Sequence, residues 1–298
     1  MNLQPDLAEL MAIRARVQGL SLHPPASVLT RLQGAYRSAQ RGRGLEFEEV
    51  RPYAEGDDVR AMDWRVTARR GKPHIKLFRE ERERPVWLVI HLHPGLFFGS
   101  RQQLKSTLAL RAAALLGWIA SLGGDRLGAC LCREASPSWI SPPRGREAGL
   151  LPILQAMVEY QPRSPGVPQM ASLVSALRQI YPLVHAGSLV YVLSDFFLVD
   201  DTLSQALAHL SSRVECRLLK LEDPLEKQGL PNGRFQLGIP GQLRWVQGDN
   251  ARQTWQTAWA ERDTQLKKTC QLLGMACISL STDETLDQTL SNMLRTCP

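Results

Sequence analysis

From Pro85 to the end of the chain, short apolar runs alternate with longer stretches of helical periodicity, and this alternation constrains the fold most. The run Val86–Ile90 is continuously apolar, as in a strand that is covered on both faces. Further strands are predicted at Arg126–Cys132, Ser138–Ser141, Ser188–Ser194, Val214–Leu221 and Ala276–Leu280. We therefore expect an α/β fold with a mostly parallel central sheet and helices on both faces.

The segments between these strands have the spacing of helices. A capping-box pattern at Ser100–Gln103 predicts the start of a helix that runs to Leu122. A hairpin is predicted from Arg234–Leu237 and Gln242–Val246. The other predicted helices are Ala148–Tyr160, Met170–Val184, Thr202–Ser212, Arg252–Leu273 and Glu284–Arg295.

The carboxyl ends of the strands are the expected place for a site, because ligands of such sheets bind where the strand order reverses. His91 and His93 follow the first strand, and Asp195 follows Ser188–Ser194. Two imidazoles and a carboxylate can ligate zinc or another transition metal. The alternative is structural: the histidines bond within the protein, and Asp195 caps the following turn.

An Arg-rich segment, Arg41–Arg84, precedes the alternating part. It holds twelve basic and ten acidic residues, within a chain of net charge +7. This near balance favours internal ion pairs over binding to nucleic acid. The natural candidates are Arg51, Arg60, Arg65 and Arg69 with Glu46, Glu49, Asp57 and Asp63.

A recognition surface for a partner protein, formed by Asp63, Trp64 and Arg69, is the second interpretation of this segment, because Trp and Arg are favoured at interfaces. Locally we expect a strand at Leu45–Arg51 and a helix that is capped at Gly56–Asp58 and ends at Gly71. Two short helices, Leu7–Val17 and Ser27–Ser38, are expected before it.

Several classes of protein are disfavoured. The N-terminus lacks a signal-peptide pattern, and the apolar run Leu108–Leu122 contains Arg111 and is shorter than the ~20 residues of a membrane span. Six cysteines without metal-ligand spacing indicate reduced thiols in a cytoplasmic protein. Since neither a nucleophile–base pair nor a phosphate loop is evident, we expect no enzymatic activity and no cofactor.

The chain resembles bacterial domain-of-unknown-function family 58, whose members carry a von Willebrand factor A-like domain. The resemblance rests on Gly42-x-Gly44-x-Glu46-Phe47, Arg51-x-Tyr53-x-x-Gly56-Asp57-Asp58-x-Arg60, Asp63-Trp64, Thr67-Ala68-Arg69, Phe98-Gly99, Gly124-Asp125-Arg126-x-Gly128 and Ser194-Asp195-Phe196. It implies a von Willebrand A-like domain at residues 85–298, preceded by an N-terminal segment at residues 1–84. It also implies a coding context shared with MoxR-type AAA+ ATPases.

Von Willebrand A domains often hold a divalent cation through Asp-x-Ser-x-Ser, a Thr and a later Asp. Here the first motif reads His91-Leu92-His93-Pro94-Gly95, and the Thr position corresponds to Ala171. Only Asp195 keeps its type, and one carboxylate is too few for Mg²⁺. We therefore expect a degenerate site that binds no metal.

The resemblance implies a protein-interaction adaptor that assists a MoxR-type ATPase in the chaperone-like maturation of a client protein. Its scaffold or partner-binding residues would be Glu46, Arg51, Tyr53, Asp57, Arg60, Asp63, Trp64 and Arg69. The alternative is a metal- or ligand-binding protein, including a hydrolase, that uses His91, His93 and Asp195. We expect neither nucleic-acid binding nor direct membrane insertion.

Overall fold

The computed structural model describes residues 3–22, 45–54, 62–80, 84–134, 137–167, 170–238 and 241–295. The chain divides into two compact units, one made of Met1–Val28 with Arg84–Pro298 and the other of Leu29–Glu83. The first residues thus belong with the large unit, whereas we expected residues 1–84 to form one segment. The reason is hydrophobic burial, since Leu10, Ile13 and Val17 lie in the large unit's core.

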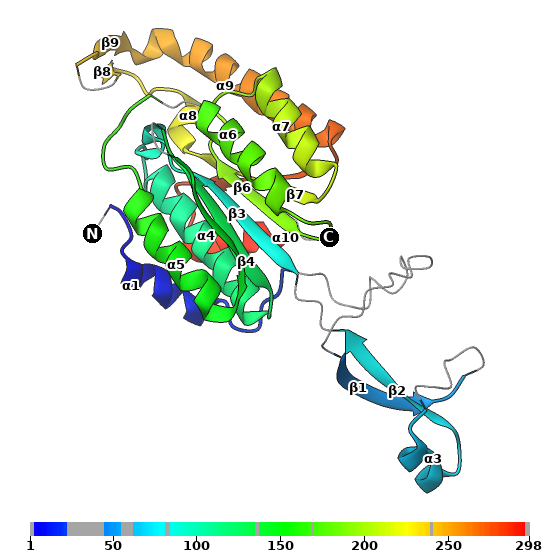
Figure 1. Ribbon diagram of the computed structural model, residues 1–298. Helices are drawn as coiled ribbons and strands as arrows, with labels where there is room; N and C mark the ends of the chain where they lie inside the picture. The colour runs from blue at the N-terminus through cyan, green and yellow to red at the C-terminus, as the bar shows by residue number, and fades with distance from the viewer. Residues whose placement is uncertain are drawn as a thin grey trace. The chain divides into compact units, whose positions relative to one another are not determined.

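The large unit is built on a six-stranded sheet with the order β10-β7-β6-β3-β4-β5 (Figure 1). All neighbouring strands are parallel except β4 and β5, which are antiparallel. The strand order reverses beside β3, and the mostly parallel α/β sheet predicted from the sequence is confirmed. The strands are β3 (Pro85–His91), β4 (Arg126–Cys132), β5 (Trp139–Gly145), β6 (Leu189–Ser194), β7 (Glu215–Glu222) and β10 (Ala276–Ser281).

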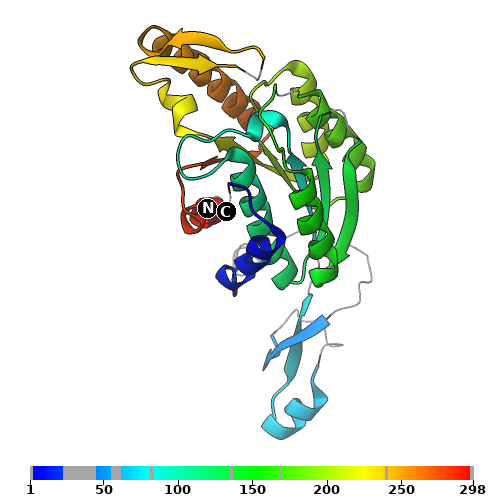
Figure 2. The same cartoon turned by 90° about the vertical axis from the view of Figure 1, so that its left-hand side faces the viewer.

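Helices cover both faces of this sheet (Figures 1 and 2). Alternate residues of β3 enter different cores: Leu88 packs in the core shared with α1, α4, α5 and α10, and Val89 in the core shared with α6, α7 and α9. The bounds are α1 (Leu7–Ala12), continued by the 3-10 turn Ile13–Arg16, α4 (Lys105–Leu122), α5 (Arg146–Tyr160), α6 (Ala171–Ile180), α7 (Asp201–Ser211), α9 (Gly248–Leu272) and α10 (Leu286–Arg295).

The start of α4 differs from the expected one. The helix begins at Lys105, and its N-cap Leu104 makes no side-chain cap bond, so the predicted capping box at Ser100–Gln103 is wrong. Ser100 is engaged elsewhere, because its backbone N–H donates to Asp223 at 2.7 Å and its hydroxyl donates to the same carboxylate. The apolar run that ends at Leu122 is a buried helix of the core.

The chain between β7 and β10 forms a short helix, a hairpin and a long helix. These are α8 (Pro224–Gln228), β8 (Arg234–Leu237), β9 (Arg244–Gln247) and α9. The predicted hairpin is confirmed, while α8 was not predicted. Only Gly248, Leu266, Thr269 and Cys270 of α9 are buried. The long helix therefore meets the core mainly through its C-terminal third, while most of its length faces solvent.

The small unit pairs β1 (Leu45–Pro52) antiparallel with β2 (His74–Glu80) and connects them through α3 (Trp64–Arg70). Asp63 caps α3, and Gly71 ends it with a left-handed φ of 67°. The expected helix included Met62, but Met62 forms a bridge with Ile75, and the helix starts two residues later. The expected cap at Gly56–Asp58 and the expected helix Ser27–Ser38 lie outside the described residues.

Within the part of the chain that the structure describes, none of the helices combines the length and the apolarity that crossing a membrane requires.

Candidate functional site

A buried ammonium group lies at the carboxyl edge of the sheet, where the carboxyl ends of the parallel strands meet. Lys105, the first residue of α4, is 2% exposed. Its Nζ lies 2.9 Å from Asp195 Oδ2, beyond β6, and 2.7 Å from Glu226 Oε1, on α8. Three segments that are distant in sequence thus converge on one positive charge.

The charges of this cluster depend on each other. Burial disfavours the charged form of Lys105, but Asp195 and Glu226 raise its pKa above the usual range. Burial likewise opposes the charge of Asp195, and Lys105 and His93 hold its pKa well below the usual range. A cation at a helix N-terminus is also disfavoured by the helix dipole. Lys105 therefore stays charged only because two carboxylates neutralise it.

His93 lies against the same carboxylate. Its Nδ1 accepts a hydrogen bond from the Gly95 N–H at 3.1 Å, so the ring proton lies on Nε2. Nε2 donates to Asp195 Oδ1 at 3.1 Å. Both nitrogens of His93 are thus in use, and the two oxygens of Asp195 receive an imidazole and an ammonium.

His91 is fully buried and takes no part in the carboxylate cluster. Its Nδ1 lies 3.0 Å from Ser194 Oγ, and its Nε2 lies 2.9 Å from Ser172 Oγ. Ala171, the expected counterpart of a metal-binding Thr, begins α6, and it is the next residue, Ser172, that reaches His91. The two histidine rings are 4.4 Å apart, but they serve different partners.

The geometry of His91, His93 and Asp195 disfavours the metal-binding alternative. The ring nitrogens of both histidines are engaged, and the described residues contain no group of three His, Cys, Asp or Glu side chains able to hold a metal ion. The cavity that Asp195 and Glu226 line has a volume of about 30 Å³. That is far below the several hundred Å³ of a small-molecule site.

Asp223 connects the surrounding loops. Besides Ser100, its carboxylate accepts from the Leu225 N–H at 2.9 Å and from the Thr282 hydroxyl, which follows β10. Asp223 also caps α8, and the Glu226 side chain accepts from its backbone N–H at 3.1 Å. The same glutamate therefore caps α8 and neutralises Lys105.

In the Arg-rich segment, the predicted residues form hydrogen bonds with backbone groups. The Asp63 carboxylate accepts from the backbone N–H groups of Arg65 and Val66, at 3.0 and 3.2 Å. Arg51 donates to the Pro52 carbonyl oxygen, and the Tyr53 N–H donates to the Pro73 carbonyl oxygen. Asp57 and Arg60 lie outside the described residues, and Glu46 is described only as a β1 residue opposite Arg79.

The residues of α3 and the turn after it form an exposed basic surface, which we call the α3 surface. Trp64 is 68% exposed, which is unusual for so large an apolar side chain. The basic members are exposed as well, and none of them forms an ion pair within the described residues. The expected partners Glu46, Glu49 and Asp57 have no described side chains, so the pairing of Arg65 and Arg69 stays a prediction. The α3 surface consists of Trp64, Arg65, Arg69, Arg70 and Lys72.

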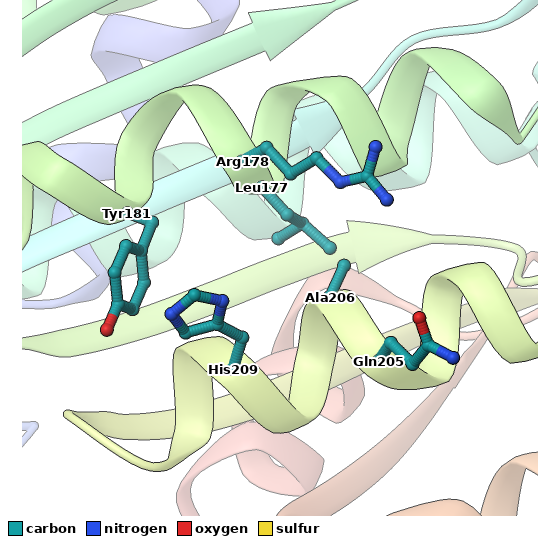
Figure 3. Close-up of a pocket in the computed structure, with 6 residues that line it drawn as sticks. All are labelled: Leu177, Arg178, Tyr181, Gln205, Ala206 and His209. Carbon is teal, nitrogen blue, oxygen red and sulfur yellow. The ribbon is translucent and has the colours of Figure 1, made fainter.

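A separate small pocket lies between α6 and α7 (Figure 3). Tyr181 and His209 lie at one end of it with ring centroids 3.8 Å apart and the ring planes tilted by 55°, and Arg178 and Gln205 border the rest. Its volume of about 160 Å³ is below that of typical ligand sites. None of the residues at the carboxyl edge lines it.

Sequence reasoning located Asp195, His91 and His93 but missed Lys105, Glu226 and Ser172. The pattern Asp223-x-x-Glu226, followed by helix formers, is a capping signal that could have revealed α8. The local sequence around Lys105 predicts an exposed side chain, because a lysine near a helix start is normally solvated.

The fold and the site together define an α/β protein in which the buried Lys105 ammonium group lies at the carboxyl ends of the parallel strands. The model of the family described as "Protein of unknown function DUF58" matches residues 49–266. The chain is also 32% identical over 257 residues to Uncharacterized protein Rv1480 of Mycobacterium tuberculosis, covering 85% of this chain and 79% of that protein. This chain therefore belongs to the DUF58 family. Uncharacterized protein Mb1516 of Mycobacterium bovis matches to the same extent.

Among solved structures, the chain is similar to a von Willebrand factor type A protein from Catenulispora acidiphila, with a TM-score of 0.45 and 9% identity. That match covers 74% of this chain and 44% of the other. The conserved hypothetical protein BatB from Bacteroides thetaiotaomicron gives a TM-score of 0.40 at 11% identity, over 72% of this chain and all of that one.

Proposed function

We propose that this protein is a non-enzymatic interaction adaptor that binds a MoxR-type AAA+ ATPase and assists it in the chaperone-like maturation of a client protein. The observation that carries the proposal is the α3 surface. An exposed tryptophan together with exposed guanidinium groups that form no ion pair within the described residues is the composition typical of binding hot spots.

The electrostatics of α3 favour an acidic partner. Arg65 and Arg69 are four residues apart and therefore neighbours on the helix, where like charges destabilise the isolated element. Arg69 and Arg70 in the last turn interact favourably with the helix dipole, but Arg65 at the start does not. Bidentate pairing with carboxylates of a partner would relieve this repulsion.

The carboxyl edge supports a role without catalysis. Lys105 and His93 satisfy Asp195, and the adjoining cavity of about 30 Å³ is far smaller than a typical ligand site. A general acid or base needs a proton within reach of a bound substrate. Here the ionisable groups stabilise the fold.

The test is binding of the full chain to the MoxR-type ATPase encoded by the same host, measured by calorimetry and by the ATPase rate. We expect Trp64→Ala and Arg69→Glu each to weaken binding by about tenfold or more, as for hot-spot residues. Trp245→Ala is the matched control, because Trp245 on β9 is 61% exposed and leaves the α3 surface intact.

No association, or equal loss in all three variants, contradicts the proposal. A duplex DNA arm tests the nucleic-acid alternative. Steeply salt-dependent DNA binding that Arg69→Glu abolishes would replace the proposed partner by a polyanion.

A further inference from the structure

Two cysteines meet where α9 joins β10. Cys270 lies in the last turn of α9, and Cys277 is the second residue of β10. The connection is a tight turn in which Gly274 has a left-handed φ of 63° and the Met275 N–H donates to the Cys270 carbonyl oxygen at 2.9 Å. This turn places both thiols on the α9 face of the sheet, where Cys270 is part of the core and Cys277 packs against that core. The two thiols are close enough there to influence each other's pKa.

The two thiols are not equivalent. The hydrogen bond with Cys270 lowers the pKa of Cys277, burial opposes this, and the ammonium groups of Lys220 and Lys267 favour the thiolate, against Asp263. The same hydrogen bond, together with burial, raises the pKa of Cys270. Cys277 is also the more exposed of the two thiols, so it is the one that an oxidant in solution reaches first.

The surroundings of Cys277 include both signs of charge. Lys220 on β7 pairs with Glu222 at 3.0 Å and with Asp263 at 2.7 Å, and Lys267 pairs with Asp263 at 2.7 Å. Two ammonium groups are thus held next to the thiol by two carboxylates. The charges around the thiol are therefore balanced in number, and the two ammonium groups favour its thiolate form.

Access distinguishes this pair from the strand cysteines. Cys277 is half-buried on β10, which is an edge strand of the sheet, whereas Cys130, Cys132 and Cys216 are buried. Burial raises the pKa of both Cys130 and Cys216 to about 12. A small oxidant therefore meets a reactive thiol at Cys277, with a second thiol already in contact.

We propose that Cys270 and Cys277 are a reversible oxidation site, in which a hydroperoxide oxidises Cys277 and Cys270 then closes an intramolecular disulfide. The Cys277 thiolate attacks one peroxide oxygen, so that an S–O bond forms, the O–O bond breaks and hydroxide, or alkoxide from an organic hydroperoxide, leaves. Cys270 sulfur then attacks the sulfenic sulfur, the S–O bond breaks, and the thiol proton leaves with that oxygen as water.

In total, two thiols and one hydroperoxide give a disulfide and two waters, or one water and one alcohol. A dithiol reductant reverses the oxidation by exchange. The bond would fasten the end of α9 to the edge strand, at the base of a helix that is otherwise mostly exposed. This inference is independent of the proposed partner.

The experiment uses the full chain, hydrogen peroxide at stoichiometric concentration, alkylation of the remaining thiols and non-reducing mass spectrometry. Trypsin leaves both cysteines in one peptide, because there is no Lys or Arg between Lys268 and Arg295. The oxidised peptide should lack the mass of two hydrogen atoms and both alkyl groups. Dithiothreitol should restore them.

Three variants separate the steps. Cys277→Ser should lose no alkylatable thiol, Cys270→Ser should hold a sulfenic acid that dimedone traps at Cys277, and Cys130→Ala, the matched control, should behave as the unmodified chain. Retention of both thiols in the unmodified chain, dimedone on another cysteine, or disulfides only between chains would overturn the proposal.

Discussion

Lys105 is the residue on which the carboxyl edge most depends. Removing one partner of a buried ion pair leaves the other charge without compensation, which is more costly than removing both. Asp195 would keep its bonds from His93 and from the Phe197 N–H but lose its charged partner, whereas Glu226 is partly exposed and can be solvated. The arrangement is therefore sensitive to charge rather than to volume.

Lys105→Met should lower the free energy of unfolding by about 3–5 kcal/mol at pH 7, because it strands the buried Asp195 charge. Lys105→Met with Asp195→Asn should recover a substantial part of this loss. Lys268→Met, on the exposed side of α9, is the matched control and should change stability by less than about 0.5 kcal/mol. Urea denaturation measures all three.

The pH profile gives an independent readout of the same pair. The folded pKa of Asp195 is lowered, so its contribution is present above the unfolded pKa of about 3.9 and is lost as the pH falls further. The folded pKa of Lys105 is raised, so its contribution is complete below about pH 10.4 and is lost at higher pH. The loss of stability caused by Lys105→Met should therefore shrink below about pH 4. A loss that stays the same there would contradict this account.

At the scale of elements, the N-cap of α8 has more partners than an ordinary cap. Asp200 caps α7 at the surface, bonding only the nearby Thr202 and Leu203. Asp223 instead bonds Ser100 and Thr282, which lie 123 and 59 residues away in the chain. One carboxylate thus joins α8 to the loop before α4 and to the end of β10.

Asp223→Ala should therefore cost more than Asp200→Ala, although both remove a helix cap. We expect about 1 kcal/mol for Asp200→Ala and at least about 3 kcal/mol for Asp223→Ala, since the buried Asp223 carboxylate also loses its charged hydrogen bonds with Ser100 and Thr282. Chemical denaturation compares the two variants. Equal losses would show that the bonds to Ser100 and Thr282 add nothing to the cap.

At the scale of the whole molecule, the two units differ in how their charges are satisfied. The large unit neutralises its buried lysine internally, while the small unit leaves the basic residues of α3 exposed and unpaired within the described chain. The basic residues of α3 are thus available to a partner. At the carboxyl edge, the positive charge is the protein's own Lys105 ammonium group.

We expect neither 10 mM Mg²⁺ nor EDTA to shift the thermal midpoint of the full chain, because an ammonium and an imidazole already occupy both Asp195 oxygens. A cation present at 100 times its Kd would stabilise the fold by about 2.7 kcal/mol, which calorimetry readily detects. A saturable rise of the midpoint with Mg²⁺, Mn²⁺ or Zn²⁺ would contradict this expectation.

The predictable elements were those with a strong local pattern. The strand at Arg126–Cys132 has its predicted bounds, and Leu45–Arg51 and Val86–Ile90 were also located, because apolar runs and alternation are read residue by residue. The missed elements depend on distant contacts. β2 has charged residues at intervals and needs β1 as its partner, while Asp223 takes the serine that was expected to cap α4.

By itself the sequence determined the α/β class, the family resemblance and the edge at which His91, His93 and Asp195 gather, because strand alternation dictates which ends meet. Tertiary structure alone decided what fills that edge. Lys105 and Glu226 are 121 residues apart, and their pairing depends on burial, which no local pattern encodes. Tertiary structure also decided that Arg65 and Arg69 are exposed, since a balanced composition does not specify which charges face the solvent.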